Sequence, residues 1–250
     1  MLRLVRAEFL KLRTTQVWFW LLLADIAIGA AVAIGSLAPA DAIKAPKDVP
    51  YLFATSNGAL ITAFVLGVLG VTTEFRYQTI TPTVLQTPSR WAVVAAKMIT
   101  YATVGVAYAA ACVGVQLAIA LPWLSAKHVA VDFGDKQLQR ALFGMLLVFA
   151  LFALLGIGVG ALLRNQILAV TLGLVFLLVL QNIIAAIPGV REAWVYTPAG
   201  ATIAILYPYE RASGDDVQLL HAPAGVMVLL LWAVVPAVIG AAITMNRDIT

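Results

Sequence analysis

Long runs of hydrophobic residues alternate with short polar segments along the chain. A helix needs about 20 apolar residues to cross the hydrocarbon layer of a membrane, which is roughly 30 Å thick. Six runs reach this length, and each predicts a transmembrane helix, over residues 17–37, 52–71, 92–121, 141–163, 167–187 and 223–245. The segments between the runs are too short for a second folded domain. The pattern therefore predicts an all-α integral membrane protein in which residues 1–250 form a single transmembrane domain.

The composition excludes the classes of protein that fold in water. Hydrophobic residues make up 62% of the chain and charged residues only 11%, whereas a soluble domain carries about 25% charged residues. The single cysteine, Cys112, cannot form an intrachain disulfide. Soluble enzymes, disordered tails and disulfide-rich scaffolds are therefore excluded.

Residues 1–15 predict a short amphipathic helix that lies flat on the membrane surface. Leu2, Val5, Phe9 and Leu12 recur at spacings of three and four, and basic residues occupy the other faces. A plain basic anchor with no further role accounts for the same residues equally well.

The basic residues predict that both chain ends lie in the cytoplasm. Arg3, Arg6, Lys11 and Arg13 precede the first run, and lysines and arginines next to a span favour the cytoplasmic side. Six spans then return the C-terminus to that side. A secretory signal peptide is the competing interpretation, but its apolar core has about 7–15 residues, and the first run is longer.

The connection over residues 72–90 carries the most informative polar pattern. It reads TTEFRYQTITPTVLQTPSR. Thr81 precedes Pro82 and Thr87 precedes Pro88, an order that suits the start of a helix. We expect a short helix over residues 82–86 that lies across the cytoplasmic face. An ordinary polar loop is the alternative.

This connection resembles the first cytoplasmic loop of the ABC type-2 permease family, the membrane subunits of ATP-binding-cassette exporters. The resemblance is carried by residues 74–80, Leu85, residues 88–90 and Lys97. Gln78 stands where the family usually has glycine. Residues 8–13, which read EFLKLR, are similar to the elbow helix of the family. Six spans also match the family, so the resemblance covers the whole chain.

The resemblance implies that the connection docks onto another subunit. In the family, this loop forms a coupling helix that sits in a groove of the ATPase subunit. Glu74 and Arg76 would belong to an inner polar gate. The residues implied to dock are Thr79, Ile80, Thr81, Pro82, Thr83, Val84, Leu85, Gln86 and Thr87.

The resemblance also implies the assembly: the permease subunit of an exporter in the cytoplasmic membrane of a prokaryote. Two copies, or one copy and a similar permease, would enclose the translocation path and meet through the first and fifth spans. Two separate ATPase subunits would bind ATP and magnesium and drive transport. A mostly apolar path favours a hydrophobic or amphipathic cargo.

Amide side chains inside the spans are candidates for the lining of this path. The resemblance points to Asn57 in the second span and to Gln181 and Asn182 in the fifth. Amides that only join neighbouring helices are the alternative. Residues 199–207 form an apolar piece that is too short to span, and it predicts a re-entrant external segment between the fifth and sixth spans.

Asp25 is the one charged residue within the first run. A carboxyl group inside a membrane is costly and is a functional candidate by default. A structural hydrogen bond to a neighbouring helix explains it equally well. The alternative function is a secondary transporter, or another multi-span protein, that uses Asp25. Such a transporter normally has several ionisable groups near the middle of the membrane.

The chain has no sequence signature of catalysis. No Gly-Lys pair is present, so there is no P-loop for nucleotide phosphates. His128 and His221 lack neighbours at metal-ligand spacing. Gly156 and Gly160 form a Gly-x-x-x-Gly pattern that predicts close helix packing. We expect no enzyme activity, no cofactor and no metal in this chain, membrane lipid around it, and no nucleic-acid partner.

Overall fold

A computed structural model describes most of the chain as helices. The described residues are 1–39, 43, 46–54, 58–77, 90–187, 189–207 and 219–246. Their longer helices are α1 (Leu2–Thr14), α2 (Val17–Leu37), α4 (Leu60–Arg76), α6 (Arg90–Ala126), α7 (Lys136–Leu163), α8 (Gln166–Val175) and α13 (Ala222–Asn246). The shorter elements are η1 (Pro46–Asp48), α3 (Val49–Ala54), η3 (Phe176–Leu180), α9 (Gln181–Ala186), α10 (Arg191–Trp194) and α11 (Pro198–Leu206). No strand occurs in these ranges, which agrees with the all-α prediction.

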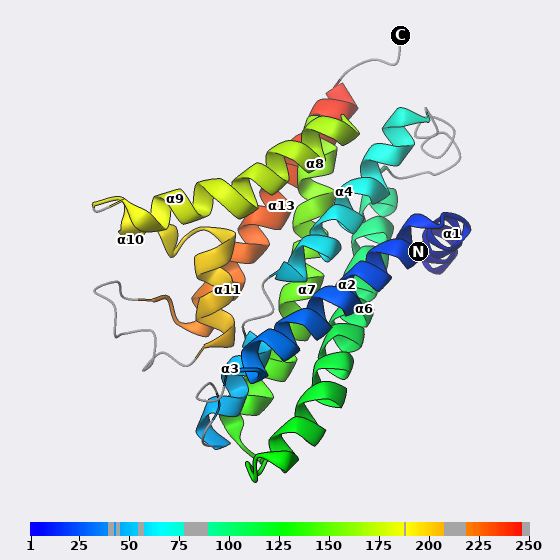
Figure 1. The fold of residues 1–250 in the computed structure, drawn as a ribbon. Coiled ribbons are helices and arrows are strands. Elements are labelled where there is room, and N and C mark those ends of the chain that lie inside the picture. Colours follow the sequence, from blue (N-terminus) through cyan, green and yellow to red (C-terminus); the bar gives the residue numbers. More distant parts are fainter. Residues whose placement is uncertain are drawn as a thin grey trace.

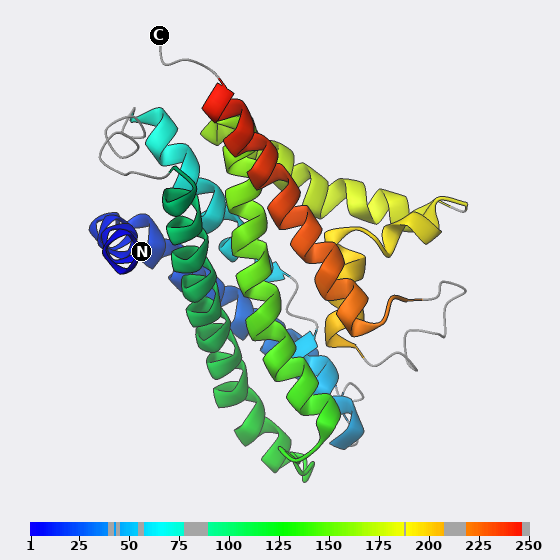
Figure 2. The same cartoon turned by 180° about the vertical axis from the view of Figure 1, so that it is seen from behind.

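The helix α7 forms the centre of the bundle, with α4, α6 and α13 packed around it (Figures 1 and 2). Glycines allow α4 and α7 to touch backbone to backbone. A Cβ atom on Gly156 would lie 2.0 Å from the carbonyl oxygen of Phe64, and one on Gly67 would lie 2.0 Å from that of Ala153. The predicted close packing at Gly156 is thereby confirmed, and its partner is α4 of the same chain.

Five helices among the described residues are long and apolar enough to cross a membrane. They are Val17–Leu37, Ala92–Ala126, Lys136–Leu163, Gln166–Ala186 and Ala222–Gly240. The run predicted as the second span, residues 52–71, is not one helix in the described parts: it is shared between α3 and α4, and residues 55–57 between them are not described. A sixth complete crossing therefore stays a prediction.

Two helices extend further into polar sequence than their apolar runs suggest. The helix α4 continues to Arg76, so residues 72–76, predicted as part of the connecting loop, form its last turn. The helix α7 begins at Lys136 rather than at residue 141, because the Asp135 side chain caps it by accepting a hydrogen bond from the Gln137 backbone N–H. An apolar run indicates which residues lie within the hydrocarbon layer, whereas the capping residue determines at which position the helix begins.

The segment predicted as the fifth span turns sharply away from α7. Arg164 ends α7 in the left-handed conformation, with φ of 53°, and Asn165 caps α8 by accepting a hydrogen bond from the Leu168 N–H. From there α8, η3 and α9 run obliquely away from the bundle to α10 (Figure 1). The segment η3 is π-helical.

The piece predicted as re-entrant is the helix α11, which packs against α13 and α7. Thr197 caps it by accepting a hydrogen bond from the Gly200 N–H. At its other end, the guanidinium of Arg140 donates hydrogen bonds to the carbonyl oxygens of Ala204 and Ile205, at 2.7 and 2.9 Å. Both ends of this nine-residue helix are thus held by side-chain hydrogen bonds. Its re-entry into the membrane stays a prediction.

Candidate functional site

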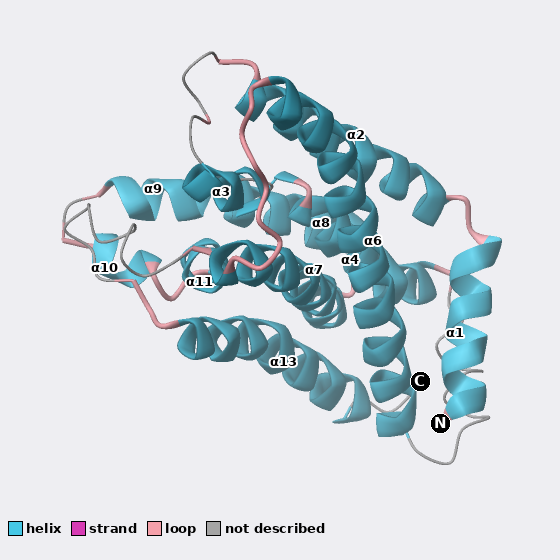
Figure 3. Ribbon diagram, turned by 90° about the horizontal axis from the view of Figure 1, so that it is seen from below, coloured by secondary structure: helices cyan, strands magenta, loops and turns pink. Residues whose placement is uncertain are grey.

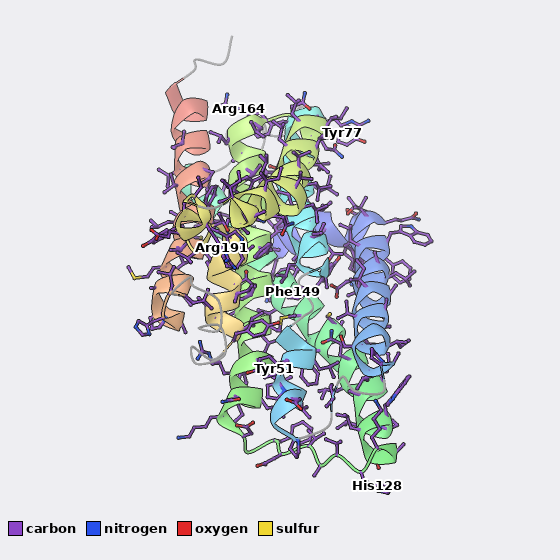
Figure 4. All side chains as sticks on the ribbon, turned by 60° about the vertical axis from the view of Figure 1, so that its left-hand side comes forward. Tyr51, Tyr77, His128, Phe149, Arg164 and Arg191 are labelled. Atoms are coloured by element: carbon purple, nitrogen blue, oxygen red, sulfur yellow. The ribbon has the colours of Figure 1, made fainter. Side chains whose placement is uncertain are left out.

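Three helices that are distant in the sequence meet at one end of the bundle. The helix α1 lies across the direction of the long helices, at the edge of the bundle beside α6 (Figures 1 and 3). The last turn of α4 and the first turns of α6 lie next to it. Tyr77 and Arg164 lie at this end of the molecule and His128 at the other (Figure 4).

Four charged side chains join these helices. The Lys97 ammonium on α6 donates hydrogen bonds to a carboxylate oxygen of Glu8 on α1 at 2.6 Å and of Glu74 on α4 at 3.0 Å. The Lys11 ammonium on α1 donates to Glu8 and to Glu74, both at 2.8 Å. Lys97 also donates to the carbonyl oxygen of Gly70 at 2.9 Å. We call Glu8, Lys11, Glu74 and Lys97 the polar junction.

The polar junction is buried and its charges balance. Glu8, Lys97 and Glu74 are 4%, 5% and 8% exposed, and only Lys11 reaches the surface. A buried charge is tolerated when it is paired and hydrogen-bonded, and here each carboxylate contacts both ammonium groups. Burial would raise the pKa of Glu8, but Lys97 and Lys11 outweigh it and lower that pKa. Burial would lower the pKa of Lys11, but its hydrogen bonds to Glu74 and Glu8 raise it.

A glycine makes room for the aromatic ring beside Lys97, the lysine at the centre of the junction. The Tyr101 ring lies 5.8 Å from the Lys97 ammonium and packs against Gly70. A Cβ atom on Gly70 would lie 2.1 Å from the Tyr101 ring. Any larger residue at this position would therefore displace the Tyr101 ring from its place beside Lys97.

A model of a known transporter family matches most of these elements. The description of the family is ABC-2 family transporter protein, and the match covers residues 4–180. The chain belongs to the ABC-2 transporter family. A comparison with curated proteins returned no match. The match includes the whole polar junction and ends at Leu180, the last residue of η3. Together with the apolar helices, it shows a multi-pass membrane protein of the ABC permease type.

Glu74 and Arg76, predicted as an inner polar gate within the connecting loop, lie in a different setting in the structure, and their role as a gate stays a prediction. Glu74 and Arg76 lie in the last turn of α4, not in a loop. Glu74 is buried in the polar junction, whereas Arg76 is exposed and donates a long hydrogen bond of 3.4 Å to Gln166. The residues predicted to dock, Thr79 to Thr87, and the amide of Asn57 lie outside the described residues.

Sequence reasoning missed Glu8 and Lys97 as partners. The sequence contained a signal for each of these two residues. Glu8 is three residues after Val5 and four before Leu12, so it lies on the apolar stripe of α1 rather than on its basic faces. Lys97 is the one charged residue of the predicted span over residues 92–121. A charge on an apolar face indicates a buried partner, although it does not identify that partner.

The other residues that the sequence analysis proposed as functional lie away from the polar junction. Asp25 on α2 is fully buried and accepts a hydrogen bond from the Thr62 hydroxyl on α4 at 3.1 Å. Gln181 is buried, donates to the carbonyl oxygen of Leu177, and accepts a hydrogen bond from the Ala199 N–H at 2.8 Å. It therefore connects α9 to the start of α11.

Asn182 differs from its neighbour Gln181. It is exposed and donates a hydrogen bond to the carbonyl oxygen of Leu178 in the preceding η3 segment. In the single chain, Gln181 holds two elements together and Asn182 faces outward; a role of either amide in lining a path stays a prediction. Within the described ranges, no three His, Cys, Asp or Glu residues are grouped so that they could hold a metal ion.

Proposed function

We propose that this chain is the permease subunit of an ATP-binding-cassette exporter. Two copies, or one copy with a similar permease, enclose the path, and two partner ATPase subunits bind ATP and magnesium and supply the energy. The observation that carries this proposal is the polar junction, which joins α1, α4 and α6 next to the segment that connects α4 to α6. Membership of the ABC-2 family supports the same assignment.

In this proposal, the polar junction transmits the movement of the ATPase subunits to the membrane helices. The docking segment, Thr79 to Thr87, follows α4 and precedes α6 in the chain. A displacement of this segment therefore acts first on these two helix ends. Lys97 connects the ends to each other and to α1, so the three helices move as one unit. The amphipathic α1 then transmits the displacement along the membrane surface.

The end that carries the polar junction faces the cytoplasm of a prokaryote in this proposal. Arg3, Arg6 and Arg13 on α1 are exposed there, and Arg164 lies at the same end (Figure 4). Fewer basic residues lie around the turn between α6 and α7 at the opposite end, where Lys127, Lys136 and Arg140 stand beside Asp132 and Asp135. This asymmetry follows the rule that basic residues stay on the cytoplasmic side.

Substitution of Leu85 by aspartate tests the docking of the ATPase. An apolar side chain that is buried only at the contact contributes roughly 1.5–3 kcal/mol, and an aspartate adds the desolvation of a charge. We expect Leu85→Asp to abolish recovery of the ATPase subunit on a tagged permease, with the permease still inserted and folded.

The matched control is Phe133→Asp in the turn between α6 and α7. Phe133 is exposed at the opposite end of the molecule, so this variant should recover as much ATPase as the wild type. Leu219 is a poorer control because it is buried. Equal recovery of ATPase by Leu85→Asp and the wild type would overturn the docking proposal.

A further inference from the structure

A cavity of about 460 Å³ opens beside the polar junction, between α1, α4, α6 and the start of α8. Pockets that hold small ligands have volumes of about 300–1,000 Å³. The first residues of α2 line the cavity as well, and most of the lining belongs to α1, the C-terminal part of α4 and the N-terminal part of α6. The cavity therefore lies at the end of the bundle that carries the polar junction. Nothing in the coupling of an ATPase to the helices requires an open space here.

The charged groups around the cavity leave a positive charge available. Its charged lining consists of Glu8, Glu74, Lys11, Lys97 and Arg76. The two carboxylates are taken by the two lysines. Lys11 uses two of its three donors in this way, and its side chain is 43% exposed. The cavity therefore favours an anion.

Arg76 is the basic residue of the cavity lining that does not belong to the polar junction. Its guanidinium lies 5.7 Å from the Tyr77 ring and donates to Gln166 at 3.4 Å. No carboxylate of the described residues pairs with it. An exposed guanidinium at the mouth of a cavity can bind an oxyanion with two parallel hydrogen bonds.

Apolar side chains also line the cavity. Trp18 of α2 and Leu66 and Leu69 of α4 line it. A small water-soluble anion would gain no binding free energy from these apolar side chains, and a hydrocarbon would gain none from Arg76 and Lys11. The two surfaces together fit a molecule that has an anionic head and an apolar tail.

We propose that this cavity binds an anionic phospholipid of the cytoplasmic leaflet. Arg76 and Lys11 bind the phosphate of its headgroup, and its acyl chains lie along Trp18, Leu66 and Leu69. Basic pockets between membrane helices on the cytoplasmic side are typical sites for such headgroups. The site rests on the orientation proposed above. It does not rest on the ATPase, so the permease alone tests it.

The experiment measures lipid binding to the purified full-length permease in detergent. We would titrate phosphatidylglycerol and phosphatidylcholine of the same short chain length and follow the thermal unfolding of the protein. Phosphatidylglycerol should bind roughly 25-fold more tightly, because Arg76 and Lys11 each contribute about a fivefold gain near a net negative headgroup. Arg76→Gln should weaken phosphatidylglycerol binding about fivefold and weaken phosphatidylcholine binding less, because the choline ammonium already neutralises the phosphate of that lipid.

Two further variants separate a defined site from general attraction to a basic surface. Arg13→Gln removes an exposed charge from α1 that does not line the cavity, and it should change phosphatidylglycerol binding less than twofold. Thr73→Trp places a large side chain in the lining and should weaken binding of both lipids. The proposal is overturned by equal affinity for the two lipids, by an unchanged Arg76→Gln variant, or by equal losses in Arg13→Gln and Arg76→Gln.

Discussion

Lys97 is the residue that holds three helices together. Its ammonium, on α6, contacts Glu8 of α1 and both Glu74 and Gly70 of α4. Lys11 cannot replace it, because Lys11 lies on α1 and leaves α6 unconnected. Burial makes this contact strong, since water does not compete for the two carboxylates, and it also makes the loss of one partner expensive.

We expect Lys97→Met to destabilise the permease by about 3–5 kcal/mol, the usual cost of removing one partner from a buried ion pair, because Glu8 and Glu74 would then share Lys11 alone. Thermal or denaturant unfolding in detergent measures the effect. The exposed Lys136→Met should stay within about 0.5 kcal/mol of the wild type. The double variant Glu8→Gln with Lys97→Met should lose less than the sum of the single variants. Additive losses would show that Glu8 and Lys97 do not act as a pair.

At the scale of elements, α4 and α7 are joined by backbone contact instead of by large side chains. The lipid around a membrane protein is as apolar as its core, so helices associate by close van der Waals packing. Gly67 and Gly156 permit this approach, and each leaves no room for a Cβ atom against the facing backbone. Because α4 ends in the polar junction, the position of α4 against α7 also sets the position of Glu74.

We expect Gly156→Ala to destabilise the protein by about 1–3 kcal/mol or more, because the new methyl group meets the Phe64 carbonyl and not a flexible side chain. Gly114 on α6 is the matched control, since no atom lies within 4 Å of its Cβ position. Gly114→Ala should be neutral, or should stabilise the helix by about 0.5–1 kcal/mol. Unfolding in detergent compares the two variants, and equal stabilities would contradict the close α4–α7 contact.

At the scale of the whole molecule, the single chain leaves broad apolar faces on α2 and on the α8–α9 segment. Phe19, Trp20 and Leu23 are exposed on α2, and Leu172 and Val179 are exposed on the other segment. Lipid covers such faces in any membrane protein, and a second permease subunit covers part of them in the proposed exporter. The first and fifth spans are the parts that we propose to meet.

Cysteine cross-linking in native membranes tests this arrangement. With Cys112 replaced by alanine, Leu23→Cys and Val179→Cys should give disulfide-linked dimers between subunits upon mild oxidation. Leu231 on α13 is also exposed, and Leu231→Cys should remain monomeric because its face is proposed to contact lipid. Dimers from Leu231→Cys alone, with none from the other two positions, would place the interface on α13.

The sequence by itself determined the class of the protein and the course of most helices. The apolar runs over residues 17–37 and 223–245 coincide closely with α2 and α13, because a lipid-facing helix must be apolar along its whole length. Polar turns at helix ends are a different case. Hydropathy does not distinguish a polar last turn from a loop, so the continuation of α4 to Arg76 appeared only in the structure.

The tertiary structure alone decided which charges meet. Glu8 and Lys97 are 89 positions apart, and Lys11 and Glu74 are 63 positions apart. No periodicity operates over such distances. The sequence showed an acidic residue on the apolar face of α1 and a single lysine in an apolar run. It could not show that the two residues pair, because their pairing depends on how α1 lies against α4 and α6. The same packing creates the cavity beside Arg76, because a cavity is a property of several helices together and of no single segment.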